Sequence, residues 1–252
     1  MLNILLSGSN GKMGKKIQEL CKDDEELKIA AGYDKLYDPS CPFPQYTDLK
    51  NVKDKVDVII DFSRPEALND LLNFAKKDLT PIILCTTGYN EDELLKIEET
   101  SKNIPVFKSA NMSLGINIIN NLLKKITPIL YDRYDIEIIE MHHNQKMDAP
   151  SGTALMLANT IQDAIPEKTN LVKGRDGVKK RNKKDIGIHA IRGGTITGEH
   201  EVMFCGTSEI ITVSHSALSR DLFAVGAIRA AKFMAGKKEP GMYNMDDLIN
   251  LD

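Results

Sequence analysis

The feature that constrains this chain most is a short apolar run, residues 2–7, that leads directly into a glycine-rich turn and then a helical pattern. The run is typical of a buried strand, and residues 12–21 carry apolar side chains at helical spacing. The alternation continues, with apolar runs at 27–33, 56–62, 81–85 and 104–107 and helical stretches from Pro65 and over 91–101. Strands that alternate with helices predict a parallel sheet covered on both faces.

The second half of the chain has a different rhythm. The predicted elements are a long helix at 114–130, a strand at 136–141, a helix at 154–165, strands at 187–192, 201–205 and 209–215, and a helix at 220–234. The last three strands are too close in sequence for crossover helices, so we expect them to be antiparallel.

The pattern therefore predicts an α/β protein with two domains. The first is a Rossmann-like, doubly wound parallel sheet that binds a dinucleotide, formed by residues 1–112 and completed by 221–252. The second is a smaller α+β domain with a mixed or antiparallel sheet, formed by residues 113–220.

Composition excludes several classes of protein. Of the 252 residues, 42% are hydrophobic and 27% are charged, as in an ordinary globular chain. The formal net charge of −3 gives no general attraction to nucleic acid, so no nucleic-acid partner is expected. No apolar run is long enough to span a bilayer, and the first residues do not resemble a signal peptide. Four scattered cysteines suggest neither a zinc site nor disulfides, so we expect a reducing cytoplasm and no membrane association.

The only basic cluster covers residues 173–184. We expect it to form a solvated, mobile loop. The alternative is a local anion patch near the substrate or a subunit contact. Nucleic-acid binding is a weaker third interpretation, because no aromatic side chains are interleaved with the charges.

The glycine turn is a candidate cofactor site. Gly8, Gly11 and Gly14 lie between the first strand and the first helix, where backbone can approach a pyrophosphate and helix amides can bind it. Asn10 stands where the commoner G-x-G-x-x-G pattern has its middle glycine, and Asn tolerates left-handed backbone. The three glycines alone could simply close a tight turn.

An acidic residue after the second strand strengthens this interpretation. Asp34 is suitably placed to accept hydrogen bonds from the ribose hydroxyls of NAD, although it could also be a plain turn residue. Lys35 could neutralise a 2′-phosphate, so the cofactor is predicted to be NADH, NADPH or both.

Two further strand ends carry polar groups. Ligands gather at the carboxyl ends of strands in such a sheet, and the segments 61–65 and 85–88 both lie there. Thr86 and its neighbours suit the carboxamide of a nicotinamide. Alternatively, Asp61 and Arg64 could form a structural pair and Thr86 a helix cap.

The segment 140–154 is the richest in chemistry. His142, His143 and Lys146 can donate protons or fix a negative charge, and the amides around Gly152 and Thr153 can hold a carboxylate at a helix start. The alternative is one buried structural histidine beside an exposed one. No metal site is predicted, because neighbouring residues on a strand point to opposite faces and the remaining histidines (His189, His200 and His215) form no helical pair.

These motifs resemble the 4-hydroxy-tetrahydrodipicolinate reductase (dihydrodipicolinate reductase) family nearly end to end. The matching segments are Gly8–Gly14, Asp61–Ser63, Thr86–Gly88, Ser109–Gly115, His142–Thr153, Gly187–Gly194, Gly198–His200 and Ser219–Arg220. The histidine segment with its Lys-x-Asp-Ala-Pro-Ser-Gly-Thr continuation is highly specific, whereas the glycine turn is not.

The resemblance implies an oxidoreductase of the diaminopimelate and lysine pathway. NAD(P)H would deliver hydride to a small cyclic imine dicarboxylate, with loss of its 4-hydroxyl, to give tetrahydrodipicolinate. The implied site residues are His142 (acid–base) and Lys146 (proton donor); His143, Ser151, Gly152 and Thr153 for the substrate; and Gly8, Ser9, Asn10, Gly11, Lys12, Met13, Asp34, Lys35, Cys85, Thr86, Thr87, Ser109, Ala110, Asn111 and Met112 for the cofactor.

The resemblance also implies a homotetramer built through the sheet of the second domain, with the final helix returning to the first. The sequence departs from the family pattern in three places. Cys85 replaces the usual glycine, Asn144–Gln145 replaces more basic residues, and the stretch 36–49 is loop-like and unusual.

Two alternatives differ in chemistry. Another Rossmann-type dehydrogenase of amino-acid synthesis, acting through a cysteine, would need an activated thiol, and neither Cys85 nor Cys205 has an obvious activating context. A non-catalytic nucleotide sensor would bind NADH without turnover, but His142 and Lys146 are intact.

Overall fold

The computed structural model describes residues 1–249 and divides into two compact units. Among the described residues, unit 1 contains 1–113 and 221–249, and unit 2 contains Leu114–Arg220. The last residues of the predicted first domain, 250–252, lie outside the described residues. Among residues 1–249, no helix has the length and apolar character needed to cross a membrane.

Unit 1 is built on a parallel sheet of seven strands. Its order is β12-β6-β5-β4-β1-β2-β3, and every neighbouring pair is parallel. The strands are β1 (Leu2–Ser7), β2 (Leu27–Tyr33), β3 (Gln45–Tyr46), β4 (Val58–Asp61), β5 (Ile82–Leu84), β6 (Pro105–Lys108) and β12 (Gly241–Tyr243). The order reverses at β1, which lies between β2 and β4, and ligands bind at such a switch point. The predicted doubly wound parallel sheet is confirmed.

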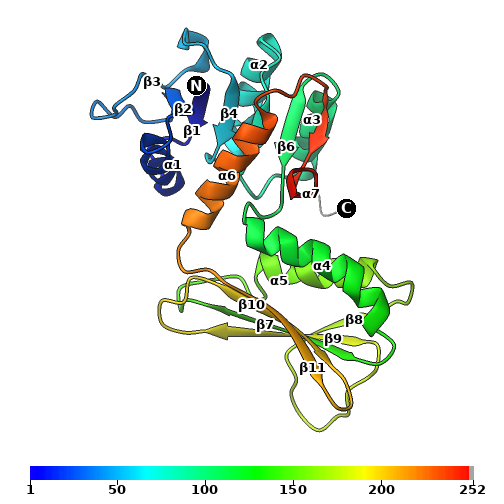
Figure 1. The fold of residues 1–252 in the computed structure, drawn as a ribbon. Coiled ribbons are helices and arrows are strands. Elements are labelled where there is room, and N and C mark those ends of the chain that lie inside the picture. The colour runs from blue at the N-terminus through cyan, green and yellow to red at the C-terminus, as the bar shows by residue number, and fades with distance from the viewer. Residues whose placement is uncertain (250–252) are drawn as a thin grey trace. The chain divides into compact units, whose positions relative to one another are not determined.

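Helices cover both faces of this sheet (Figure 1). α1 (Lys12–Lys22) and α6 (Asp221–Met234) pack together on one face, and α2 (Leu68–Lys77) and α3 (Glu91–Ser101) pack together on the other. Three short elements complete the unit, namely the 3₁₀ turns η1 (Leu49–Asn51) and η2 (Pro65–Ala67) and the helix α7 (Met245–Ile249).

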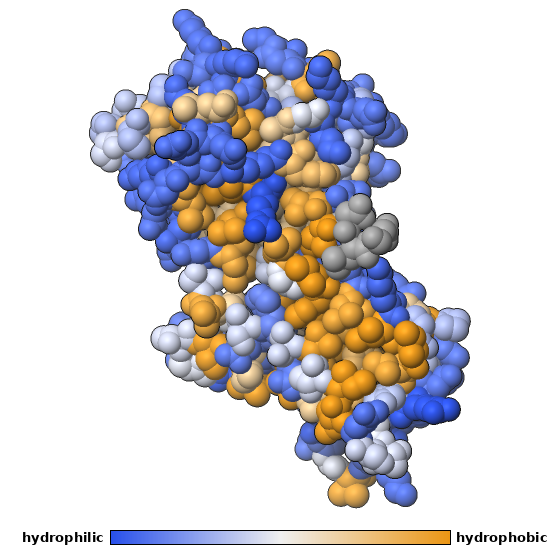
Figure 2. Space-filling view, in the orientation of Figure 1, coloured by the Kyte–Doolittle hydropathy of each residue, from blue (hydrophilic) through white to orange (hydrophobic). Residues whose placement is uncertain are grey.

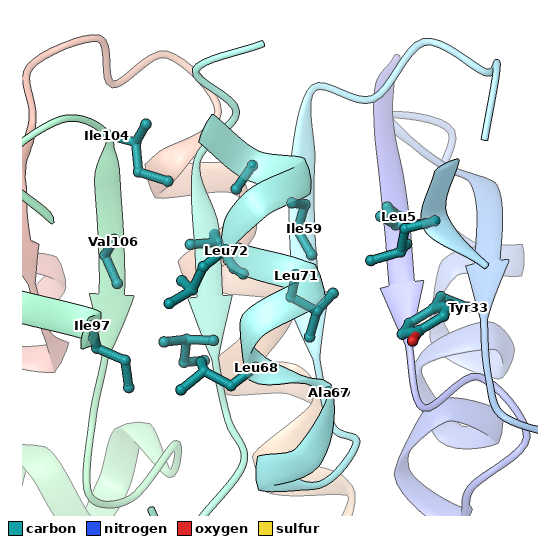
Figure 3. Packing of buried hydrophobic residues seen from close by; sticks show 14 of the residues in the cluster. Leu5, Tyr33, Ile59, Ala67, Leu68, Leu71, Leu72, Ile97, Ile104 and Val106 are labelled. Carbon is teal, nitrogen blue, oxygen red and sulfur yellow. The ribbon is translucent and has the colours of Figure 1, made fainter. Parts of the chain in front are cut away.

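The packing of α2 shows why the first half of the chain folds this way. Pro65 opens the helical segment, where its missing amide leaves no hydrogen bond unmade. Leu68, Leu71 and Leu72 recur at helical spacing and are buried against strand residues such as Ile59 (Figure 3). Each fully buried leucine contributes about 1.5–3 kcal/mol relative to an exposed one, so this face of α2 fixes the helix on the sheet.

Unit 2 is a mixed sheet of five strands with two helices on one face. The sheet order is β11-β10-β7-β9-β8. Its elements are α4 (Leu114–Leu130), β7 (Asp135–His142), α5 (Gly152–Asp163), β8 (Asn170–Lys173), β9 (Asp185–Arg192), β10 (Glu199–Cys205) and β11 (Ile210–Ser216). Side chains of β7 alternate between half-buried and buried, and the buried ones join the cluster under α4 and α5. The predicted mixed sheet is confirmed.

The pairing predicted for the last three strands was partly wrong. β10 and β11 are antiparallel neighbours, but β9 pairs in parallel with β7 and β8. The central strand β7 therefore lies between β9 and β10. A short connection fixes the relative direction of two strands but not their adjacency. The link 193–198 is long enough to pass over one strand, since neighbouring strands are only about 4.8 Å apart.

Two segments predicted to be loops are more ordered than expected. Within 36–49, β3 pairs with β2, and the side chain of Asp48 caps η1 by accepting from the Lys50 amide. Both features are too short for a periodic pattern to reveal them.

The basic segment is held to the sheet. The Arg181 guanidinium contacts Glu137 and Asp135 at 2.9 Å each, and Arg175 contacts Glu137 at 3.1 Å. Gly187 leaves the space for Glu137, since a Cβ there would lie 1.7 Å from the Glu137 Oε2. Nearly all of the segment is exposed, as expected of a solvated loop, but its two arginines are ion-paired with the sheet.

Candidate active site

The glycine turn of unit 1 has the close packing that its pattern predicts. Gly8 has a left-handed φ of +75°, and a Cβ on it would lie 2.5 Å from the Phe62 carbonyl oxygen. Gly14 brings α1 against the turn, because a Cβ there would lie 2.2 Å from the Gly8 carbonyl oxygen. Any larger residue at either position would push the helix start away from the sheet.

The turn leaves the first amides of α1 available to a ligand. The amides of the turn itself already have acceptors: Gly8 and Ser9 donate to the Tyr33 carbonyl at 2.9 and 3.4 Å, Asn10 to Asp34 Oδ2 at 3.0 Å, and Gly11 to the Gly8 carbonyl at 3.0 Å. In contrast, the N-cap Gly11 offers no side-chain cap, and the first turn of α1 contains no acidic residue. An anion at this helix end would be bound by amides of Lys12 and Met13 and favoured by the helix dipole.

A pocket of about 650 Å³ lies beside this helix start. It is lined by Gly8, Asn10, Gly11, Tyr33, Asp34, Lys35, Leu36, Phe62, Ser63, Arg64, Glu66, Ala67 and Asp70. These residues follow β1, β2 and β4, so the pocket occupies the switch point of the sheet. Glycine backbone, a carboxylate and cationic side chains together fit a dinucleotide.

Asn10 links the turn to the unusual segment 36–49. Its Nδ2 donates to the Leu36 carbonyl at 2.6 Å, and its Oδ1 accepts from Gln45 Nε2 at 2.6 Å. Gln45 also donates to Ser9 Oγ at 2.9 Å. Asn10 therefore does more than tolerate the turn geometry, since its side chain holds the loop that follows Asp34. Nothing in the sequence pattern singled out Gln45.

The carboxyl ends of β4 and β5 are joined through Asp61. This buried carboxylate accepts from the Ser63 amide at 3.0 Å, from the Ser63 hydroxyl at 2.5 Å, and from the Thr86 hydroxyl at 2.8 Å. Within residues 1–249, neither structural alternative for this region holds. Asp61 accepts hydrogen bonds from Ser63 and Thr86 instead of pairing with Arg64. The Thr86 hydroxyl bonds to Asp61 instead of capping a helix. Burial, with a smaller effect of Asp61, raises the pKa of Cys85 well above its usual value.

The remaining predicted cofactor residues follow β6. The Ser109 hydroxyl donates to the Asn111 carbonyl at 3.0 Å, and Met112 is buried. Gly226 of α6 allows this segment to pack closely, because a Cβ there would lie 1.7 Å from the Met112 carbonyl oxygen. All predicted cofactor residues thus lie in unit 1 at or just after the carboxyl ends of β1, β2, β5 and β6.

In unit 2, the end of β7 carries a buried acid–histidine pair. Glu140 and His142 point to the helix-covered face, and His142 Nδ1 lies 2.6 Å from Glu140 Oε2. Arg192 of β9 donates to both Glu140 oxygens, at 2.8 Å from Nη1 and 2.7 Å from Nη2. Although burial acts to raise the pKa of Glu140, hydrogen bonds from Arg192, His142 and the Ser151 amide lower it overall, so Glu140 is ionised.

His142 is mostly buried, and its Nε2 lies next to the backbone of Gly198. Burial lowers its pKa below the usual value, although Glu140 opposes this effect. Its Nε2 lies 3.0 Å from the place that a Cβ on Gly198 would occupy. The His142 ring also meets His200 edge-on, with centroids 5.2 Å apart at 75°. The burial of His142 alone would fit a structural histidine. A structural histidine, however, would not need a glycine next to its Nε2.

Ser151 and His200 fix the start of α5. The Ser151 hydroxyl accepts from the Ala154 amide at 3.1 Å and lies 2.9 Å from His200 Nε2. Both residues are buried, and burial, helped by the nearby His142, lowers the pKa of His200 to about 4. The structure therefore makes Ser151 a helix cap, whereas Gly152 and Thr153 stand in the exposed first turn of α5.

Lys146 and His143 complete the cluster from the loop after β7. Lys146 Nζ lies 2.8 Å from Asp148 Oδ1, and the Lys146 hydrogen bond lowers the pKa of Asp148. His143 is half-exposed, with Nε2 3.3 Å from an Arg220 nitrogen. All four features of the segment 140–154 lie in unit 2: His142 is linked through Glu140 to the α5 N-cap Ser151, whereas His143 contacts Arg220 and Lys146 contacts Asp148.

Sequence reasoning did not select several members of this cluster. They are Glu140, Arg192, Gly198 and His200. Glu140 lies two residues before His142 and shares a face with it, a period-2 signal that could have identified it. Arg192 lies in β9, His200 in β10 and Gly198 directly before β10, and only the sheet pairing brings them to β7.

Comparison with known proteins assigns both halves of the chain to one family. The family model described as dihydrodipicolinate reductase, N-terminus, matches residues 2–112, and that described as dihydrodipicolinate reductase, C-terminus, matches residues 115–249. Two relatives named 4-hydroxy-tetrahydrodipicolinate reductase cover 99% of this chain and 98% of their own length. They come from Clostridium novyi, at 56% identity, and Clostridium tetani, at 53%.

Solved structures agree on the fold. A dipicolinate-bound dihydrodipicolinate reductase from Paenisporosarcina sp. TG-14 superposes with a TM-score of 0.82 at 22% identity and covers 100% of both chains. A probable dehydrogenase from Thermotoga maritima superposes with a TM-score of 0.63 at 13% identity, over 99% of this chain and 93% of its own.

Proposed function

The chain belongs to the dihydrodipicolinate reductase family, and on that premise we propose that it reduces 4-hydroxy-tetrahydrodipicolinate to tetrahydrodipicolinate. This step belongs to diaminopimelate and lysine biosynthesis, and its balance is substrate, NAD(P)H and a proton to product, NAD(P)⁺ and water. One observation carries the proposal: in a chain that matches the family models over residues 2–112 and 115–249, the candidate acid–base residue His142 is linked through Glu140 to the amide of Ser151, the N-cap of α5.

Unit 1 is proposed to bind the cofactor. The amides of Lys12 and Met13 would hold the pyrophosphate, and Asp34 would accept from the adenosine ribose. Lys35 would meet a 2′-phosphate, so both NADH and NADPH are substrates in this proposal. A bound reduced nicotinamide supplies the hydride. Thr86, fixed by Asp61, offers its backbone and neighbouring Thr87 to orient the carboxamide.

Unit 2 is proposed to bind the substrate and supply the proton. A dianion needs cationic and amide donors, and His143, Lys146 and the start of α5 at Gly152 and Thr153 offer both. Loss of the 4-hydroxyl as water gives an α,β-unsaturated imine, and when hydride reaches it, negative charge develops on the ring and must be quenched by an acid. Lys146 would give that proton, and His142 would exchange protons as acid–base partner.

The two alternative functions fit less well. A cysteine-dependent dehydrogenase needs a thiolate, but burial raises the pKa of Cys85 and also that of Cys205. A nucleotide sensor has no use for a cationic cluster with a buried carboxylate behind it. Neither alternative explains why a glycine, Gly198, lies next to His142 Nε2.

A coupled assay tests the function. The purified protein would receive the fresh product of a dihydrodipicolinate synthase, and the absorbance of NADH or NADPH would be followed. The proposal expects cofactor oxidation that depends on the synthase product. Binding of cofactor without such oxidation would support the sensor instead.

We also propose a homotetramer in the cytoplasm. The sheet of unit 2 has helices on one face only, and β11 exposes Ile210 at its edge. Hydrophobic residues also gather over α4 (Figure 2), where Ile118, Leu122 and Ile129 are exposed. The four cysteines are all free thiols, which suits a reducing compartment. Native mass spectrometry would test the assembly, and a monomer at working concentration would refute it.

A further inference from the structure

The carboxylate of Glu140 is the most heavily bonded buried group of the acid–histidine cluster. Its side chain has no solvent exposure. Oε2 accepts from His142 Nδ1 and Arg192 Nη1, and Oε1 accepts from Arg192 Nη2 and the Ser151 amide at 2.9 Å. A buried carboxylate is costly unless it is satisfied in this way, so the sheet keeps Glu140 charged and fixed.

This arrangement determines which nitrogen of His142 carries a permanent proton. An ionised carboxylate can only accept hydrogen bonds, so Nδ1 of His142 must be the donor. The neutral ring then has its lone pair on Nε2, and the protonated ring differs from it only by a proton on Nε2. Proton exchange is thereby confined to one atom.

Within residues 1–249, Nε2 of His142 makes no hydrogen bond, so its lone pair is available to a reaction partner. Gly198 faces it, and a methyl group there would lie 3.0 Å from Nε2. His200 packs against the ring edge-on and restricts its rotation. The charged groups that face His142 are Glu140 on its own strand, Arg192 on β9 and Lys146 on the loop, while His200 faces it from β10.

We propose that Glu140, held by the paired hydrogen bonds of Arg192, is a positioning residue that fixes the His142 ring so that Nε2 alone exchanges a proton with the substrate. This inference rests on the proposed function and specifies the chemistry of the same site. Arg192 acts through Glu140, and it also donates to the Asp148 carbonyl at 2.7 Å, which ties the Lys146 loop to the same clamp.

The chain contains a matched control on the same strand. Glu137 lies on the opposite face of β7 and contacts His189 Nε2 at 2.8 Å, together with Arg175 and Arg181. Glu137→Gln therefore removes a carboxylate from a similar histidine–arginine cluster without touching His142. Glu140→Gln makes the same change beside His142.

The first test is the tautomer of His142 in the unaltered protein, measured by long-range ¹H–¹⁵N NMR with ¹⁵N-labelled histidine and assigned by a His142→Gln variant. The inference expects the Nδ1–H form above the pKa of the ring. In Glu140→Gln, we expect a lower His142 pKa, because a negative charge is lost, and an admixture of the Nε2–H form. In Glu137→Gln, both should stay as in the unaltered protein.

The second test is kinetic. Glu140→Gln should lower kcat by about 10–100-fold with little change in KM, and its pH profile should shift to lower pH, whereas Glu137→Gln should stay within about twofold. An Nε2–H tautomer in an active unaltered protein would overturn this inference alone. Absence of turnover in the unaltered protein would overturn the proposed function as well. If Glu140→Gln does not fold, the tautomer of the unaltered protein still decides.

Discussion

At the scale of single residues, the cluster around His142 contains two kinds of side chain. Some are proposed to contact the ligand, and the others position those side chains. The proposed proton donors are Lys146 and His142, whose Nε2 makes no hydrogen bond within residues 1–249. Glu140, bonded to Arg192, and His200, edge-on to the ring, support His142. The roles assigned to the first pair therefore predict losses of turnover rather than of folding.

Replacing His142 or Lys146 with Ala should lower kcat by about a hundredfold or more, since each removes a group that transfers a proton. Because both residues lie in unit 2, the dissociation constant of NADH should not change. Steady-state kinetics and fluorescence titration of NADH measure the two quantities. Unchanged turnover in both variants would contradict the assignment.

Asp34→Ala should weaken binding of NADH by about tenfold, the effect of one lost charge-assisted hydrogen bond. NADPH should be affected less, because the hydroxyl that Asp34 would bind carries a phosphate in NADPH. The change also removes the acceptor of the Asn10 amide, so folding should be checked by thermal melting. Equal weakening of both cofactors would argue against the contact.

The buried His200 predicts how stability depends on pH. Its folded-state pKa of about 4 is below the ordinary value of 6.5, because burial and the neighbouring His142 disfavour the charged ring. Between these values the unfolded chain binds the extra proton, so the free energy of unfolding should fall as pH decreases from 6.5 to 4. The loss should be about 3 kcal/mol.

Urea denaturation at a series of pH values measures this loss. His200→Gln should remove most of it, whereas the half-exposed His143→Gln should leave it in place. A pH dependence that is the same in His200→Gln and in the unaltered protein would show that another group is responsible.

At the scale of secondary structure, regular elements were predictable and irregular ones were not. β1, β2, α3 and α4 begin and end where the apolar pattern places them. β3, β8 and β12 span only two to four residues each and owe their pairing to neighbouring strands rather than to any period. The same holds for the candidate site. The segment 140–154 is contiguous in sequence and could be recognised, whereas Arg192, Gly198 and His200 come close to it only through strand pairing.

The ion pairs that hold the basic segment 173–184 to the sheet lead to a prediction at this scale. Arg181 donates to Glu137, Asp135 and three backbone carbonyls, of Ile136, Asn182 and Asp185. Arg181→Ala should lower the free energy of unfolding by about 1–3 kcal/mol, because these acceptors, some of them partly buried, lose their donor. The exposed Lys180→Ala should change it by less than about 0.5 kcal/mol. Equal effects would show that the segment is not held by Arg181.

At the scale of the whole molecule, we propose that the two units have separate tasks. Unit 1 has the switch-point pocket and the helix start of α1, and unit 2 has the proposed proton donors and the start of α5. The sequence predicted both sheets correctly, because each depends on many apolar positions. It could not predict the order of strands in unit 2, because no local pattern shows that β7 lies between β9 and β10.

The central proposal is that His142 and Lys146 act on the substrate that the bound nicotinamide reduces. A crystal structure with oxidised cofactor and dipicolinate tests it most directly. We expect His142 Nε2 and Lys146 within hydrogen-bond distance of the dipicolinate, with its ring over the reactive face of the nicotinamide. A structure in which this cluster lies far from the nicotinamide, or faces bulk solvent in every copy, would contradict the claim.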